Sequence, residues 1–292
     1  MMNHLKTIKN YFSLVRFSHT VFAMPFALTG YALAVSEPEY NFSVKLLILI
    51  ILCMVFARNA AMGFNRLADK KFDALNPRTR NREIPAGIIG SRAAAVFVVL
   101  NAVLFMFTTA FINRLTLYLS PVALLIILGY SLTKRFTLLC HFILGLGLSL
   151  APVGAYISLT GKFSILPLIY SFIVLTWVSG FDIIYALQDN EFDKSNKLHS
   201  VPSAAGIKNA IAVSVAIHII TFLLVILAGL VGNGNWIYWT GACLFSLFLL
   251  YQHLIVKHND LSKVNLAFGT TNGVASIIFA VFVILDLYFR YQ

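Results

Sequence analysis

Residues 44–73 read VKLLILIILCMVFARNAAMGFNRLADKKFD. The first part of this stretch, residues 44–64, is almost uniformly apolar, and a helix of roughly 20 such residues crosses the hydrocarbon core of a bilayer. Polar residues then follow at a fixed interval. Asn65, Asp69 and Asp73 are four residues apart, so on a helix they share one face. The stretch therefore predicts a membrane helix that ends in an acidic face.

The rest of the chain is similarly apolar. Its 292 residues are 59% hydrophobic and only 11% charged, whereas soluble domains carry about 25% charged residues. A water-soluble fold cannot cover so much apolar surface, which disfavours a soluble enzyme, a nucleic-acid-binding domain and a disordered tail. The three cysteines lie in apolar runs without metal-ligand spacing and are interpreted as buried small side chains: Cys53, Cys140 and Cys243.

Apolar runs of membrane-spanning length recur along the whole chain, which predicts a single all-α membrane domain over residues 1–292 with about nine transmembrane helices in a bundle. The first run is too long for a signal peptide and has no small-residue cleavage site, so we expect no removed signal. The nine predicted spans are 18–35, 44–64, 93–112, 115–132, 138–159, 165–187, 210–231, 236–256 and 266–289.

Most of the 22 basic residues fall on one side of this arrangement. They gather in the N-terminal segment, in the connections after the second and sixth predicted spans, and in two shorter turns on the same side. Cytoplasmic loops are rich in Lys and Arg, so this asymmetry predicts a cytoplasmic N-terminus and an outer C-terminus. The two long connections, 69–92 and 189–208, are then both cytoplasmic, and long loops between short ones are where function concentrates. The net charge of +11 is thus explained mainly by topology.

The acidic pattern occurs twice. Asp189 and Asp193 repeat the spacing of Asp69 and Asp73 at an offset of 120 residues, and Asp182 and Tyr185 extend the second face. The offset is consistent with an internal duplication. Solvated helix ends paired with nearby lysines are one interpretation. The other is a cation site, because carboxylates suit Mg²⁺, which keeps positions open for the phosphate oxygens of a substrate. Two facing clusters would hold two or more Mg²⁺ ions around a diphosphate.

Basic residues accompany these aspartates on the same side: Arg78, Arg80 and Arg82 after the first cluster, and Lys134 and Arg135 at the end of the fourth predicted span. They suit either lipid headgroups or a phosphate. Arg16 and Arg58 lie near or within apolar segments, where an arginine usually faces the bundle interior and has a partner. Contact with an anionic substrate and a structural pairing both remain open for these two.

Asn65-Arg-Leu-Ala-Asp69-Lys-Lys-Phe-Asp73 resembles the NxxxDxxxD motif of the UbiA superfamily of membrane prenyltransferases. Residues 182–193, DIIYALQDNEFD, resemble its second motif, DxxYAxxDxxxD. Further stretches are similar to members that prenylate aromatic acids in quinone biosynthesis: residues 16–26, 76–80, 84–87, 130–137 and 198–202. The resemblance covers residues 15–206 with specific motifs. Residues 82–87 read REIPAG where many members have RPIPSG. This difference weakens the inference about which acceptor is used, but it does not affect the inference about the metal site.

The resemblance implies a helical bundle around a lipid-open cavity, with Mg²⁺ as cofactor. It implies that Asn65, Asp69, Asp73, Asp189 and Asp193 hold Mg²⁺ and a polyprenyl diphosphate, with Asp182 and Tyr185 beside them. Arg78, Arg80, Lys134 and Arg135 would contact the diphosphate, and Arg16 the carboxylate of an aromatic hydroxy acid. No protein partner is readable from the sequence. An integral protein of a bacterial inner membrane is expected, with its active site on the cytoplasmic side.

The expected reaction is Mg²⁺-dependent transfer of a polyprenyl group to an aromatic ring, with 4-hydroxybenzoate favoured as acceptor in ubiquinone- or menaquinone-type biosynthesis. A hydroxynaphthoate acceptor is the alternative. Tyr185 would either steady an allylic cation or orient Asp189. A secondary transporter would need ionisable residues near the middle of the membrane, and a nonenzymatic scaffold leaves both clusters unexplained. A CDP-alcohol phosphotransferase is expected to have an Asp-Gly pair upstream of its aspartates, which is absent here.

Overall fold

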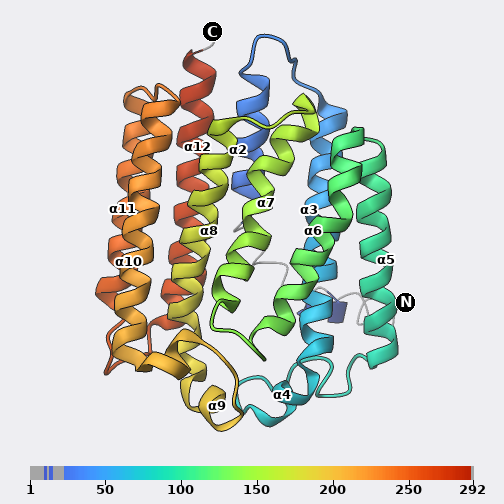
Figure 1. Ribbon diagram of the computed structural model, residues 1–292, viewed down its shortest axis with the longest axis vertical. Helices are drawn as coiled ribbons and strands as arrows, with labels where there is room; N and C mark the ends of the chain where they lie inside the picture. The colour runs from blue at the N-terminus through green and yellow to red at the C-terminus, as the bar shows by residue number, and fades with distance from the viewer. Residues whose placement is uncertain (1–9, 12, 16–22, 291–292) are drawn as a thin grey trace.

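The computed structural model describes residues 10–11, 13–15 and 23–290, and it is a bundle of helices (Figure 1). Apart from one isolated bridge between Lys257 and Asp260, these residues contain no β-structure, which confirms the all-α prediction. The long helices are α2 (Met24–Val35), α3 (Val44–Ala68), α5 (Ser91–Ala110), α6 (Arg114–Thr133), α7 (Cys140–Thr160), α8 (Ile165–Ala186), α10 (Val201–Val231), α11 (Trp236–Ile255) and α12 (Asn272–Arg290).

Seven of the helical segments within the described residues are long and apolar enough to cross a membrane. They comprise α3, α5, α6, α7, α8 with the turns after it, α10, and α12 with the turn before it. Helix α2 is apolar but has only 12 residues. Helix α11 has 20 residues, and its polar and aromatic side chains, among them Gln252 and His253, lower its hydropathy. Within the described residues, seven of the nine predicted spans correspond to helices long and apolar enough to cross a membrane, and α2 and α11 lie at the places of the other two.

Helices α7 and α8 form the centre of the bundle, with α2 packed on α7 and α10 on α8 (Figure 1). Small residues allow the closest approaches. A Cβ at Gly30 of α2 would lie 2.0 Å from the carbonyl oxygen of Pro152 on α7, so this crossing requires glycine. Trp177 of α8 is fully buried in the main core and packs against Phe245 and Phe26. The core thus fixes α8, which carries the second acidic motif.

Two short helices, α4 (Lys70–Leu75) and α9 (Asn190–Ser195), lie at the same end of the bundle (Figure 1). We call this the α4/α9 end. Each short helix follows a long one after a break at an aspartate: Asp69 after α3, and Asp189 in the 3₁₀ turn η2 (Leu187–Asp189) after α8. The two breaks and the two six-residue helices are offset by the same 120 residues as the motifs.

One expectation about segment boundaries is wrong. The connection 189–208, expected to be a long loop, is mostly helical. A capping box between Ser200 and Ser203 starts α10 at Val201, and Gly206 kinks it with φ of +79°. The last predicted span, 266–289, agrees with the apolar helical segment Leu266–Arg290, whose first turn is π-helical (η3, Leu266–Thr271) and precedes α12. By contrast, the boundary between the third and fourth predicted spans is sharp, because the Asn113 side chain accepts a hydrogen bond from the Thr116 backbone.

Candidate active site

The first acidic motif keeps its helical face across the break at the end of α3. The Asn65 side-chain amide donates to Asp69 Oδ2 at 3.1 Å. The backbone N–H groups of Asp69 and Asp73 bond to carbonyl oxygens four residues earlier, so the i, i+4 register continues. The spacing therefore does place Asn65, Asp69 and Asp73 along one side of the chain at the α4/α9 end.

Four motif aspartates at this end each contact a basic side chain. Asp69 lies 3.3 Å from Arg135, Asp73 lies 2.7 Å from Arg82, Asp193 lies 2.8 Å from Lys134, and Asp189 is paired with Arg78. Two of these pairs, Asp189–Arg78 and Asp193–Lys134, join the first half of the chain to the second. The site therefore balances four acids against four bases, and it joins segments that are far apart in the sequence.

Arg78 holds Asp189 with two nitrogens, the geometry in which a guanidinium grips a carboxylate best. Its Nε donates to Asp189 Oδ1 at 3.0 Å and its second nitrogen reaches Oδ2. A third nitrogen donates to the Tyr185 hydroxyl at 2.9 Å, and Asn76 also donates to Asp189 Oδ1, at 3.0 Å. The Tyr185 ring stacks on Phe268 of η3 with centroids 4.0 Å apart. The π-helical turn η3 thus packs against the Tyr185 ring of the second motif through Phe268.

Burial and neighbouring charges together raise the pKa values of two groups at this end, Asp69 and Lys134. Burial raises the pKa of Asp69, the nearby Asp73 carboxylate raises it further, and Arg135 only partly offsets both. Burial lowers the pKa of the Lys134 ammonium, but the attraction and hydrogen bond of Asp193 outweigh this and raise it. Lys134 therefore stays charged, and the Asp69–Asp73 pair gains from additional positive charge beside it.

The donor set at this end suits Mg²⁺. Carboxylate and amide oxygens are its usual protein ligands, and one or two carboxylates with water and phosphate oxygens complete its shell. Asp73 Oδ2 is buried and accepts no hydrogen bond from the residues that the structure describes, so it offers a lone pair to a cation. In the parts of the chain that the structure describes, no three Asp, Glu, His or Cys side chains converge on one ion. Binding through fewer carboxylates at a time fits this arrangement.

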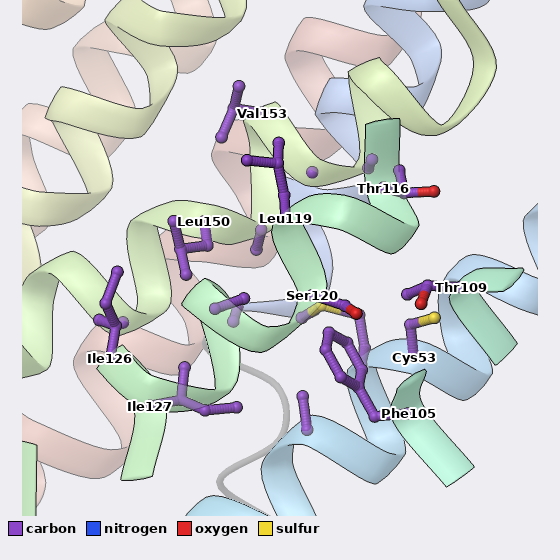
Figure 2. A pocket seen from close by; sticks show the side chains of 18 of the residues that line it. Cys53, Phe105, Thr109, Thr116, Leu119, Ser120, Ile126, Ile127, Leu150 and Val153 are labelled. Atoms are coloured by element: carbon purple, nitrogen blue, oxygen red, sulfur yellow. The ribbon is translucent and has the colours of Figure 1, made fainter. Parts of the chain in front are cut away.

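A cavity of about 330 Å³ lies between α3, α5, α6 and α7 (Figure 2). On α6 its lining runs from Tyr130 to Thr116, a length of about 21 Å at the helical rise. Tyr130 is one helical turn before Lys134, so the cavity begins near the paired charges. Figure 2 shows mostly apolar side chains such as Leu119, Ile127 and Phe105 around it, with a few hydroxyl groups. Among the described lining residues, Arg58 alone carries a charge.

The remaining predicted residues have different surroundings. Asp182 contacts His141 at 2.7 Å, and no basic Arg or Lys pairing is found for it within the described chain. Arg80 is exposed on the loop after α4. Arg16, expected to contact the acceptor, lies outside the described residues. Five further residues of this region were not predicted as site residues: Asn76, Arg82, Phe268, Ser200 and His141. Arg82 carried a signal as one of three arginines after the first motif, and Asn76 and Ser200 lie in stretches that resemble the family.

Comparison with known proteins identifies the family. A model described as the UbiA prenyltransferase family matches residues 23–283. The 4-hydroxybenzoate octaprenyltransferase of Vibrio campbellii is 30% identical over 270 residues, which is 91% of this chain and 90% of that protein. The protein of the same name from Nitrosomonas eutropha is 32% identical over 238 residues, covering 80% and 82% of the two chains.

Solved structures with the same fold are also found. An apo UbiA homologue from Aeropyrum pernix K1 superposes with a TM-score of 0.83 at 32% identity, over 92% of this chain and 98% of that chain. A UbiA homologue from Archaeoglobus fulgidus, bound to DMAPP and Mg²⁺, superposes with a TM-score of 0.75 at 22% identity, over 96% and 99% of the chains.

Proposed function

This chain belongs to the UbiA prenyltransferase family, and we propose that it transfers a polyprenyl group from its diphosphate to the ring of an aromatic hydroxy acid. The observation that carries the proposal is the set of four acid–base pairs at the α4/α9 end, next to a long apolar cavity. A prenyl diphosphate has the matching construction, with a highly charged head and an apolar tail. We favour 4-hydroxybenzoate as acceptor, with a hydroxynaphthoate as the alternative.

The acid–base pairs suit a site in which the basic side chains exchange carboxylate partners for phosphate oxygens when the substrate binds. When a diphosphate enters, Arg78, Lys134, Arg135 and Arg80 would turn to its oxygens, because a phosphate accepts charge-assisted hydrogen bonds as a carboxylate does. This frees carboxylates. Asn65, Asp69, Asp73, Asp189 and Asp193 would then hold Mg²⁺, which when bound supplies positive charge that stabilises a departing diphosphate. Asp69, Asp73, Asp189 and Asp193 would then have a positively charged partner in both states.

The chain's own residues then control the transfer. The allylic C–O bond of the donor breaks, a ring carbon ortho to the acceptor hydroxyl forms the new C–C bond, and the proton lost from that carbon passes to the released diphosphate. The positive side chains stabilise the leaving group as its charge develops. The apolar cavity excludes water, which would otherwise capture the allylic cation. Tyr185, fixed by Arg78 and Phe268, is placed to keep Arg78 aligned with Asp189.

The membrane arrangement follows from the charge asymmetry. We propose nine spans, with α2 and α11 included, a cytoplasmic N-terminus, and the α4/α9 end on the cytoplasmic side of a bacterial inner membrane. This places the charged site at the membrane face where a membrane-bound prenyl diphosphate presents its head and where a water-soluble aromatic acid is available. It also places the acids at one membrane face. A secondary transporter would instead require them near the middle of the membrane.

Incubation of the purified protein with Mg²⁺, a polyprenyl diphosphate and a panel of aromatic acids is expected to yield a prenylated hydroxybenzoate or hydroxynaphthoate. Chelation with EDTA should abolish the product, and added Mg²⁺ should restore it. Mass spectrometry of the lipid extract identifies which acceptor is used. Failure to prenylate any acceptor of the panel in the presence of Mg²⁺ would exclude the proposed reaction.

Gly154 provides a test of the tail site. It lines the cavity, and a Cβ at this position would meet no atom within 4 Å, so a larger side chain would extend into the space assigned to the tail. We expect Gly154→Phe to lower kcat/KM for a long polyprenyl donor by about 100-fold while dimethylallyl diphosphate is affected less than about threefold. The fold should be retained, because phenylalanine has a higher helix propensity than glycine, by roughly 0.5 kcal/mol.

Gly129→Phe is the matched control. Gly129 lies on α6, also has open space around a Cβ, and is not among the residues lining the cavity. Both donors should react with this variant as with the unmodified protein. Equal losses for long and short donors in Gly154→Phe would show that the tail does not occupy this cavity.

A further inference from the structure

A buried histidine connects three helices beside the site. His141, at the start of α7, is 2% exposed. Its Nδ1 lies 2.7 Å from Oδ2 of Asp182 on α8, and the backbone N–H of Val201, the first residue of α10, donates to its Nε2 at 3.3 Å. The proposed exchange of partners at the four acid–base pairs involves none of these contacts, so His141 and Asp182 remain to be explained.

The hydrogen bonds assign the tautomer of His141. A backbone N–H can only donate, so Nε2 must present its lone pair to Val201. The ring hydrogen is therefore on Nδ1, where it is donated to the Asp182 carboxylate. His141 thus acts as a connector with two different ends: it donates to α8 and accepts from α10. Asp182 fixes the orientation of the ring, and the ring fixes the start of α10.

The segment that His141 holds contains Asp193. The Ser200 hydroxyl, directly before Val201, donates to Asp193 Oδ2 at 2.8 Å. Lys134 contacts Oδ1 of the same carboxylate at 2.8 Å, and its backbone carbonyl accepts from the His199 N–H at 2.7 Å. Residues 193–201 are therefore anchored to the rest of the site at Lys134 and at His141. Loss of either anchor would let Asp193 and Lys134 move.

We propose that His141 is a positioning residue for the diphosphate: it ties residues 193–201 to Asp182 and so keeps Asp193 and Lys134 in place to receive the substrate. The inference rests on the proposed prenyl transfer and assigns a role to Asp182, which acts through His141 rather than by touching the diphosphate. Loosening this tie should weaken the binding of the prenyl diphosphate more than it slows the chemical step.

Two substitutions separate the two ends of the connector. In His141→Asn the shorter amide can still donate to Asp182 but does not reach Val201. In His141→Gln the longer amide can present its oxygen near the position of Nε2 and accept from Val201. We expect His141→Asn to raise KM for the prenyl diphosphate about tenfold, the value of one hydrogen bond, with kcat within about twofold. His141→Gln should raise KM less than about threefold.

Val201→Pro removes the same hydrogen bond from the other side, because proline has no N–H. Proline is favoured at the first position of a helix, and Ser200 already has the extended conformation that must precede it, with φ of −142° and ψ of 156°. This variant should reproduce the effect of His141→Asn. The double variant should be no worse than either single one, since both remove one interaction.

The accessibility of Cys140 tests whether His141 holds residues 193–201 in place, and this test does not depend on prenyl transfer. It is 7% exposed, and its Sγ lies 3.4 Å from the His199 carbonyl oxygen. With Cys53 and Cys243 replaced by alanine, labelling of membranes with a water-soluble maleimide should be at least about tenfold faster in His141→Asn than in the parent. His218→Asn, a change at an equally buried histidine of α10, should leave both KM and labelling unchanged.

Unchanged KM and unchanged Cys140 labelling in both His141→Asn and Val201→Pro would overturn the inference, as would a loss confined to kcat. If the unmodified protein transfers no prenyl group, the proposed function fails instead. The labelling result then still decides whether His141 holds residues 193–201.

Discussion

Replacing Asp69 and Asp189 together by alanine is expected to reduce prenyl transfer by at least about 10³-fold. Each is the aspartate at which a long helix breaks into a short one, and each contacts an arginine of the site. Losing both carboxylates removes proposed Mg²⁺ ligands from both motifs and leaves Arg135 and Arg78 without their carboxylate partners. Loss of a single stabilising group in such sites typically costs 10²- to 10³-fold in rate. The measurement is the initial rate of product formation in detergent or nanodiscs at saturating Mg²⁺.

The matched control is the double variant Glu39→Ala and Asp260→Ala. Both acids are exposed and lie outside the site, Glu39 near Lys162 at 3.8 Å and Asp260 in a turn where it accepts from the Ser262 N–H. This variant should keep its rate within about twofold. Full activity after loss of Asp69 and Asp189 would contradict the assignment of both motifs to the reaction.

Arg58→Leu is expected to lower kcat/KM for the aromatic acid by about 10- to 100-fold, while KM for the prenyl diphosphate changes little. Arg58 is the charged residue among those that line the described part of the cavity, and a charge-assisted hydrogen bond to a carboxylate is worth about 1.5–3 kcal/mol. Arg58→Lys should lose less, because it keeps the charge but not the two-pronged geometry. Steady-state kinetics with each substrate varied in turn provides the measurement.

A phenol without a carboxyl group makes this test specific. It should be a poor acceptor for the unmodified protein and should react at nearly the same rate with Arg58→Leu. Arg92→Leu, which changes an exposed arginine at the start of α5, serves as the control and should leave both acceptors unaffected. Equal losses of acid and phenol in Arg58→Leu would assign Arg58 a structural role.

The long helices were predictable because lipid imposes a simple rule: an apolar run of sufficient length must become a helix. The register of Asn65, Asp69 and Asp73 was also predictable, since it depends only on helical spacing. The breaks at Asp69 and Asp189 were not, because the DxxxD spacing fits a continuous helix equally well. The start of α10 at Val201 was missed although Ser200, Pro202 and Ser203 form a recognisable start signal.

The choice of partners within the site could not be read from the sequence. Asp73 pairs with Arg82 and not with Lys70 or Lys71, which are closer to it in the sequence, because the loop after α4 turns back towards α4. Asp189 pairs with Arg78 of the other half because α4 and α9 meet at one end of the bundle. Such contacts depend on tertiary packing, which spacing along one helix does not encode. For the same reason, His141 could be seen as a histidine in an apolar run but not as the partner of Asp182.

The direction of the cavity determines how the apolar tail of a substrate would pass between the bilayer and the enzyme. The cavity lies along the helix axes for about 21 Å, out of roughly 30 Å of hydrocarbon. It reaches the outer surface of the bundle at Val122 and Phe163, both lining residues that are more than half exposed. A polyprenyl tail bound in this cavity would exchange one apolar surrounding, the bilayer, for another. Its transfer free energy would then be close to zero whatever its length, so the affinity for the donor would reside in the charged head, and a prenylated product would return to the leaflet without crossing water.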